Sequence, residues 1–231
     1  MLGIDEQHQN LILRHGPVVN HTRTAAFAFA GQLPAQFAQA ACSSKSDPAD
    51  AKNPFNPVYD KKTGKLTMLK FDSKKDGKID TWSYMDGTRI VRIEIDRDGD
   101  GKIDRWEYYA ADQKVEKIGL SRENDGQVDA WAYPAPDGSV GRMEISTKRD
   151  GKVSRTEYYQ GGVISRAEED TKGTGRIDKW ETYRSGALHT VAFDEQQRGT
   201  PTRRLVYGLD GTVRAEVDPQ GTGDFVLAPS K

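Results

Sequence analysis

A glycine that returns every 24 or 25 residues constrains the fold of this chain more than any other feature. Such a period indicates a repeat architecture, in which each unit is one supersecondary element that buries its apolar surface against its neighbours. In four of the units a tryptophan follows the glycine by five residues, and these are all the tryptophans in the chain. The register glycines are Gly77, Gly101, Gly126, Gly151, Gly175, Gly199 and Gly223.

Each unit is predicted to form two antiparallel strands. Residues 103–109 alternate, with Asp104, Trp106 and Tyr108 on one face and Glu107 among those on the other. Mid-unit pairs such as Asp86-Gly87 are hairpin signals, because glycine adopts positive φ without steric cost. We therefore predict an all-β fold, a hairpin meander of about twelve to fourteen strands in an elongated, spiral or shell-like sheet. A hydrophobic fraction of 35% favours the open form over a thick core.

The aromatic ladder of the predicted sheet allows two interpretations. The tryptophans and the tyrosines two residues after them could form a glycan-binding surface. We favour a structural role, because a sheet with one polar face must bury the other, and rings of neighbouring units can stack to do so.

The loop between two units carries the clearest chemistry. Residues 96–107 read D-R-D-G-D-G-K-I-D-R-W-E, which matches the calcium-loop pattern D-x-D-x-D-G-x-I-x-x-x-E. Ca²⁺ takes six to eight hard oxygen ligands. The predicted ligands are the carboxylates of Asp96, Asp98, Asp100 and Asp104, with the carbonyl of Lys102, and Glu107 stands at the twelfth position.

These twelve residues resemble an EF-hand loop. In an EF-hand, the twelfth residue is a bidentate ligand carried by the exiting helix, which assigns that role to Glu107. The segment after Gly101 is predicted to be a strand, so Asp104 and Glu107 point to opposite faces. We expect Asp104 to be the ligand and Glu107 to lie on the solvent face.

The strand context is similar to the calcium loops of integrin-type FG-GAP repeats. Residues 58–225 as a whole resemble the two-stranded hairpin repeats of bacterial surface proteins, including YD-type, MORN-like and cell-wall-binding repeats. This resemblance implies a structural or binding role without catalysis.

The other loops keep the glycine and lose ligands. Lysine takes the third loop position at Lys74, Lys148 and Lys172, where an ammonium can neutralise the acids of its own loop. The alternative to any metal site is that aspartate and glycine serve as turn formers, because aspartate side chains cap their own backbone.

Residues 1–57 share nothing with the repeats. Arg23, a short apolar run and a small-residue stretch ending at Cys42 resemble a secretory signal. Cleavage could follow Ala38-Gln39-Ala40, or Cys42 could become the lipidated N-terminus of a lipoprotein. We predict a leader over residues 1–41, a polar linker over 42–57 and the repeat domain over 58–231, in an exported protein of the periplasm, outer membrane or cell surface.

Several functional classes receive no support from the sequence. The formal net charge of −1 offers no basic field for nucleic acid. Three of the four histidines lie in the predicted leader, and no nucleophile pair, zinc spacing or phosphate loop is recognisable. We therefore expect a non-catalytic, calcium-binding structural or interaction protein. A module that binds cell-envelope glycan or protein is the alternative, and membrane contact is expected only through a lipid anchor.

Overall fold

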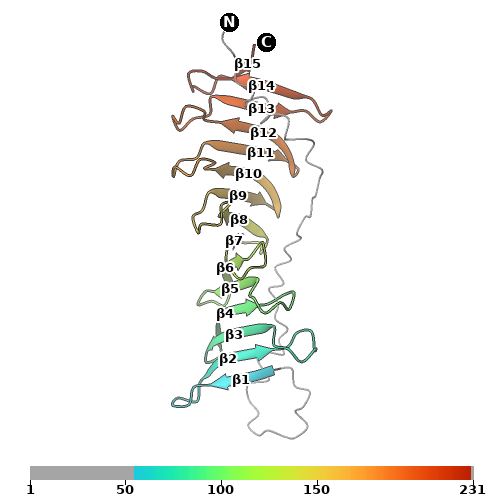
Figure 1. Cartoon of the computed structure of the whole chain (residues 1–231), viewed down its shortest axis with the longest axis vertical. Helices are drawn as coiled ribbons and strands as arrows, with labels where there is room; N and C mark the ends of the chain where they lie inside the picture. Colours follow the sequence, from blue (N-terminus) through green and yellow to red (C-terminus); the bar gives the residue numbers. More distant parts are fainter. Residues whose placement is uncertain (1–54, 230–231) are drawn as a thin grey trace.

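The computed structural model describes residues 55–229, which form one open sheet of 15 antiparallel strands (Figure 1). Each strand pairs only with its neighbours in sequence, so the predicted all-β meander is confirmed, with one strand more than the upper expectation. The strands are β1 (Phe55–Tyr59), β2 (Leu66–Phe71), β3 (Thr81–Asp86), β4 (Arg89–Ile95), β5 (Arg105–Tyr109), β6 (Val115–Leu120), β7 (Ala130–Pro134), β8 (Val140–Ile145), β9 (Arg155–Gln160), β10 (Val163–Glu169), β11 (Lys179–Arg184), β12 (Ala187–Phe193), β13 (Arg203–Tyr207), β14 (Val213–Val217) and β15 (Val226–Leu227).

The predicted leader and lipid site lie outside the described residues. This concerns residues 1–41, Cys42 and the linker as far as residue 54. The first strand begins at Phe55, which is three residues before the predicted start of the repeat domain. Within residues 55–229 there are no helices, and hence none that could cross a lipid bilayer.

A repeated irregularity twists the sheet. In six hairpins the register shifts between the middle of the strands and the turn, for example between Tyr84 and Met85 where β3 meets β4. Such β-bulges bend a strand and increase its right-handed twist. The shifts recur in every hairpin from β1–β2 to β11–β12, so the twist accumulates along the stack and the strands turn progressively along its length (Figure 1).

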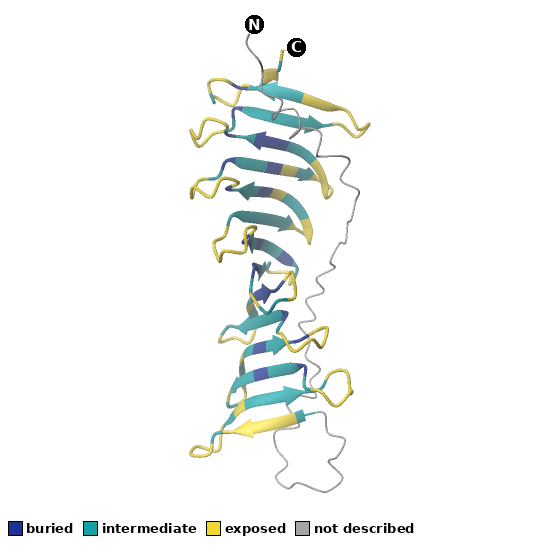
Figure 2. Cartoon of the chain, viewed as in Figure 1, coloured by how far each residue is buried: buried dark blue, intermediate teal, exposed yellow. Residues whose placement is uncertain are grey.

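One face of the sheet, here called the core face, contains the apolar core. Cross-strand pairing places Ile93, Glu107, Ile118, Ala132 and Met143 side by side across β4 to β8. The buried positions lie within the strands and at the strand ends where the loops begin and close, and the loop tips are exposed (Figure 2). The main cluster consists of Ile118, Leu120, Ala130, Ala132, Val140, Met143 and Ile145.

Charged triads lie among the apolar residues of the core face. A basic residue, a glutamate and a tyrosine alternate along β5, β9 and β11. In β9, Arg155 Nε donates to Glu157 at 2.8 Å, and the Tyr159 hydroxyl donates to the same carboxylate at 2.6 Å. Arg155 also reaches Glu169 at 3.2 Å and Glu181 at 2.7 Å. The network satisfies half-buried charges across three strands, as buried ion pairs require.

The tryptophans lie on the opposite face, here called the ladder face. Trp82, Trp106, Trp131 and Trp180 are all half-buried. The prediction that they form the buried face is therefore wrong. Neighbouring cations cover the faces of several rings on this side, as where Lys117 Nζ lies 4.5 Å from the centre of the Trp131 ring. One pair of rings is also in contact, because the Tyr108 and Trp131 ring centres lie 5.8 Å apart.

Candidate metal centre

The loop between β4 and β5 is shaped by its own aspartates. The Asp96 carboxylate accepts hydrogen bonds from the backbone N–H groups of Gly99 at 2.7 Å and Gly101 at 2.9 Å. Both glycines have positive φ, 84° and 89°, which a side chain would strain. At the other end of the loop, the N–H of Arg97 donates to Asp104 Oδ2 at 2.6 Å. These bonds hold the loop closed on itself.

Other loops repeat this arrangement without the full set of acids. Asp170 accepts from the N–H groups of Gly173 and Gly175, and Asp218 accepts from those of Gly221 and Gly223. Burial alone would raise the pKa of Asp170, but these backbone donors outweigh it and lower the pKa. The aspartate at the first loop position therefore acts as a turn former in these repeats, as the alternative to metal binding proposed.

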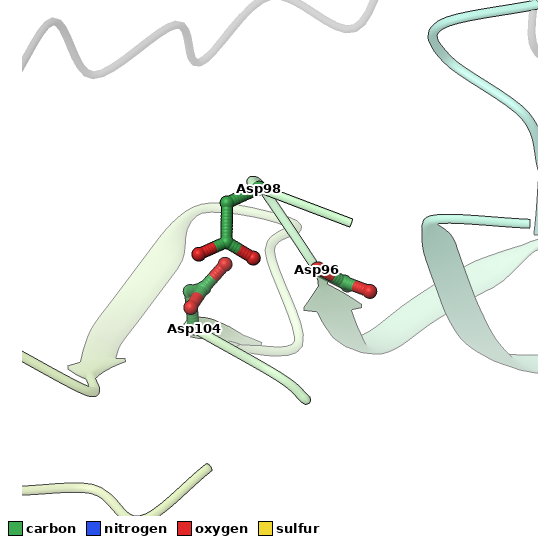
Figure 3. A group of neighbouring side chains, drawn as sticks. All are labelled: Asp96, Asp98 and Asp104. Carbon is green, nitrogen blue, oxygen red and sulfur yellow. The ribbon is translucent and has the colours of Figure 1, made fainter. Parts of the chain in front are cut away.

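Three aspartates of the second loop gather where an ion could bind. Asp96, Asp98 and Asp104 each offer one carboxylate oxygen, and these oxygens lie within 4.8 Å of one another. Figure 3 shows the carboxylates of Asp98 and Asp104 directed toward each other, with Asp96 beside them. Asp96 and Asp104 are buried, and Asp98 is exposed. Within residues 55–229, no other group of acids, histidines and cysteines meets this geometry.

One atom of this group lacks a protein partner. Asp104 is only 5% exposed, and its Oδ1 atom has no hydrogen-bond partner among the described residues. A buried carboxylate oxygen left unpaired is costly, because its lost hydration is not replaced. A hard cation would satisfy this oxygen and offset the repulsion among the three charges. The residues present therefore fit Ca²⁺ by ligand type, with the remaining ligands left to water or backbone carbonyls.

One predicted ligand, Asp100, lies outside this group. Asp100 Oδ1 accepts from the Lys102 N–H at 2.8 Å, a bond that lowers the pKa of Asp100, and Asp100 Oδ2 lies 3.3 Å from Lys102 Nζ. Lys102 Nζ also approaches the backbone carbonyl of Asn124 at 3.4 Å. Asp100 is thus paired within the loop, outside the group of three.

Glu107 lies on the core face, in the strand after the loop. Arg105 Nε donates to Glu107 Oε1 at 2.6 Å, and the Tyr109 hydroxyl donates to Oε2 at 2.7 Å. Its side chain is only 16% exposed, so the expectation of a solvent-facing Glu107 is wrong. A strand exit points this carboxylate into the sheet, whereas the helix of an EF-hand would direct it back to the ion.

Two of the three lysines at the third loop position, Lys74 and Lys148, also lie elsewhere than predicted. Lys74 Nζ approaches Gly99 of the next loop, and Lys148 Nζ approaches Gly173 of the next loop. They therefore do not replace an ion within their own loops. Stacking of repeats in register brings each loop against its neighbour, which sequence position alone did not reveal.

A groove and an amide complete the surroundings of the site. The first two loops enclose a groove of about 390 Å³, lined among others by Lys74, Asp80, Asp96 and Asp98. On the other side, the Asn124 amide of the third loop donates to Asp98 Oδ2 at 2.5 Å. Asn124 was not among the predicted site residues. The only signal for it is its place on the loop one repeat beyond Asp98.

Comparison with known proteins supports the loop assignment. The EF-hand family matches residues 93–109, which cover the end of β4, the loop and β5. No curated protein matches this chain.

Solved structures give only distant likenesses. A mutant of S. aureus TarM in complex with fondaparinux, alpha-GlcNAc-glycerol and UDP is 15% identical with a TM-score of 0.33, over 44% of this chain and 22% of that one. A crystal structure of TarM gives the same identity and TM-score, over 44% of this chain and 21% of that one. Accessory secretory protein 1, 2 and 3 of Streptococcus pneumoniae is 13% identical with a TM-score of 0.24, over 65% of this chain and 20% of that one. The chain thus spans about a fifth of the length of each of these three solved chains, and no functional conclusion follows from these likenesses.

Proposed function

We propose that this chain is a non-catalytic, exported β-repeat protein that binds Ca²⁺ through Asp96, Asp98 and Asp104. Its role is structural or interactive, as in the hairpin repeats of bacterial surface proteins that it resembles. The ion joins the end of β4 to the start of β5 and stiffens the sheet at that point.

The observation that carries this proposal is the unpartnered Asp104 Oδ1. Equivalent aspartates in other loops have both oxygens bonded: Asp178 accepts from the Thr171 N–H at 2.8 Å through Oδ1 and from the Thr171 hydroxyl at 3.0 Å through Oδ2. Thr171 fills the second loop position, where the calcium loop has Arg97. An arginine side chain supplies no hydroxyl to Asp104, and an ion takes that place.

Three carboxylates without a bidentate glutamate predict weak binding. Calcium affinity rises with the number of charged ligands and the rigidity of the site, and extracellular modules bind with Kd values of about 10⁻⁴–10⁻³ M. We expect this range here. It suits a protein of the periplasm or cell surface, where calcium is more abundant than in the cytosol.

Calorimetric titration with Ca²⁺ tests the site. Asp98→Ala removes a ligand at an exposed position and should abolish binding. Glu107→Gln keeps the hydrogen-bonding shape of a side chain on the core face and should leave the Kd within about twofold. If Glu107→Gln abolishes binding as Asp98→Ala does, Glu107 is a ligand as in an EF-hand, and the proposed three-aspartate site is wrong.

Export and anchoring have their own test. If Cys42 is lipidated, the protein partitions with membranes and Cys42→Ser releases it; if the leader is cleaved after Ala40, the mature protein begins at Ala41 and stays unanchored. N-terminal sequencing of native material distinguishes these outcomes. Recovery of intact residues 1–20 would reject export through this segment.

A glycan-binding role is the second candidate, and the half-exposed tryptophans of the ladder face favour it. A sugar would have to displace the cations that cover neighbouring rings, such as Arg142 at 4.3 Å from the centre of the Tyr133 ring. Binding to cell-wall glycan that is lost in Trp106→Ala and kept in Asp98→Ala would support this role over a purely structural one.

A further inference from the structure

Lysines at the third loop position reach forward by one repeat. Lys74 Nζ lies 3.4 Å from where a Cβ on Gly99 would stand. Lys148 Nζ lies 2.8 Å from the corresponding point at Gly173. Both lysines are exposed, and each side chain ends beside the glycine at the fourth position of the loop one repeat further along the chain. The contact is therefore a recurring feature of the stacked loops.

At the second loop, this ammonium stands beside the proposed calcium ligands. Lys74 lines the same groove as Asp96 and Asp98. The glycine beneath it, Gly99, donates its N–H to Asp96 Oδ1. Within the described residues Lys74 makes no ion pair, so its positive charge acts on the site through space.

We propose that Lys74 of the first repeat holds down the Ca²⁺ affinity of the Asp96–Asp98–Asp104 site in the second repeat. This rests on the proposed function, because it concerns the same site. An ammonium beside the site stabilises the three carboxylates when no ion is bound and repels a divalent cation that enters. The affinity of the site is thus set by a residue outside the calcium-loop pattern, and calcium binding couples two successive repeats.

The size of the effect follows from Coulomb's law. A divalent and a monovalent cation a few ångströms apart at a wet surface repel enough to change a binding constant about tenfold. The interaction is partly exposed, so salt should screen it, and the Debye length falls to about 3 Å at 1 M ionic strength. Removal of the charge should therefore tighten binding about tenfold at low salt, and by less at high salt.

The full chain is titrated with CaCl₂ by calorimetry at low salt and again in about 1 M KCl. Lys74→Met removes the charge and keeps much of the length of the side chain. Lys148→Met is the matched control, because it removes the same charge from the same loop position, against a loop without the three-acid group. Lys74→Arg keeps the positive charge and is the conservative control. Circular dichroism checks that each exposed substitution leaves the sheet intact.

The expected result is a Kd about tenfold lower for Lys74→Met at low salt, a smaller difference at high salt, and values within about twofold of wild type for Lys148→Met and Lys74→Arg. Wild-type binding with an unchanged Kd in Lys74→Met would overturn the role of Lys74 and leave the calcium site standing. Equal tightening in Lys74→Met and Lys148→Met would overturn it too, by attributing the effect to net charge. Absence of heat in both wild type and Lys74→Met would overturn the calcium site together with this inference.

Discussion

The substitution Asp104→Asn should make the protein more stable than the wild type in the absence of calcium. In the presence of calcium, the variant should be less stable than the wild type. Asp104 brings a third negative charge to Asp96 and Asp98, with ligand oxygens within 4.8 Å. Two unit charges 4.8 Å apart repel by about 0.9 kcal/mol in water, and by more in a less polar environment. Asparagine is neutral, so it removes the repulsion with Asp96 and with Asp98. It also removes the negative charge from the buried position of the unpartnered Oδ1.

The same substitution has a smaller cost. In the wild type the Arg97 N–H donates to the Asp104 carboxylate, and in the variant it donates to a neutral amide oxygen. This change weakens the hydrogen bond by about 0.5–1 kcal/mol. The balance in the absence of calcium is a gain of about 1 kcal/mol in the free energy of unfolding. At a Ca²⁺ concentration ten times the Kd, the wild type gains about 1.4 kcal/mol and the variant nothing, so the order of the two stabilities reverses.

Urea unfolding followed by tryptophan fluorescence measures this, because Trp106 follows the loop directly in β5. Titrations are run with EDTA and with excess Ca²⁺, and midpoints are compared because a repeat array need not unfold in two states. The matched control is Asp178→Asn in the fifth loop. Asp178 has both oxygens hydrogen-bonded to Thr171, so its substitution should destabilise the protein by about 1 kcal/mol regardless of calcium.

Two results would refute this reasoning. If Asp104→Asn lowers the EDTA midpoint as Asp178→Asn does, Asp104 is a turn former like its equivalents and the charge cluster carries no strain. If the variant keeps the full calcium-dependent shift of the wild type, Asp104 is not a ligand.

Three further predictions concern the rest of the sheet. Burial alone would raise the pKa of Glu181, but hydrogen bonds from Arg155, Lys179 and Tyr183 lower it to about 2. This carboxylate therefore stabilises the fold above its unfolded pKa of about 4.3, and the stability should fall as the pH drops from there toward 2. Urea titrations across this pH range should find this dependence reduced in Glu181→Gln. Gly119→Ala should lower the free energy of unfolding by about 1–3 kcal/mol, because the new Cβ would meet the Trp131 ring at 3.0 Å; an unchanged urea midpoint would contradict this packing. Asn124→Ala removes the amide that positions Asp98 and should weaken Ca²⁺ binding in calorimetry by about two- to fivefold, whereas a variant with unchanged affinity would separate the third repeat from the site.

The hairpin repeat could be read from the sequence because its signals are local. Gly101 and the other register glycines require positive φ in the loops, and alternation between them permits only strands. The carboxylates of the second loop are likewise specified by spacing within nine residues. Asp96 and Asp104 close the same turn, so their proximity needs no knowledge of distant contacts.

The choice of buried face could not be read in this way. Trp106 and Glu107 alternate along β5, and aromatic residues suggested that the tryptophan side was the core. The core face is instead defined across strands, where Ile93 and Ile118 flank Glu107. Arg105 and Tyr109 satisfy that glutamate on the buried side, which is possible because a basic residue and a tyrosine stand two residues before and after it.

Contacts between repeats depended on tertiary structure for the same reason. Lys74 and Asn124 lie more than twenty residues from the aspartates they approach, and nothing in their own loops marks them. Strand alternation and turn conformation act over a few residues, so the sequence alone determined the strands, the turns and the acids of the calcium loop. Register, bulges and twist decide which loop lies against which, so only the tertiary structure decided that the site of one repeat is bordered by the charges and amides of the repeats on either side.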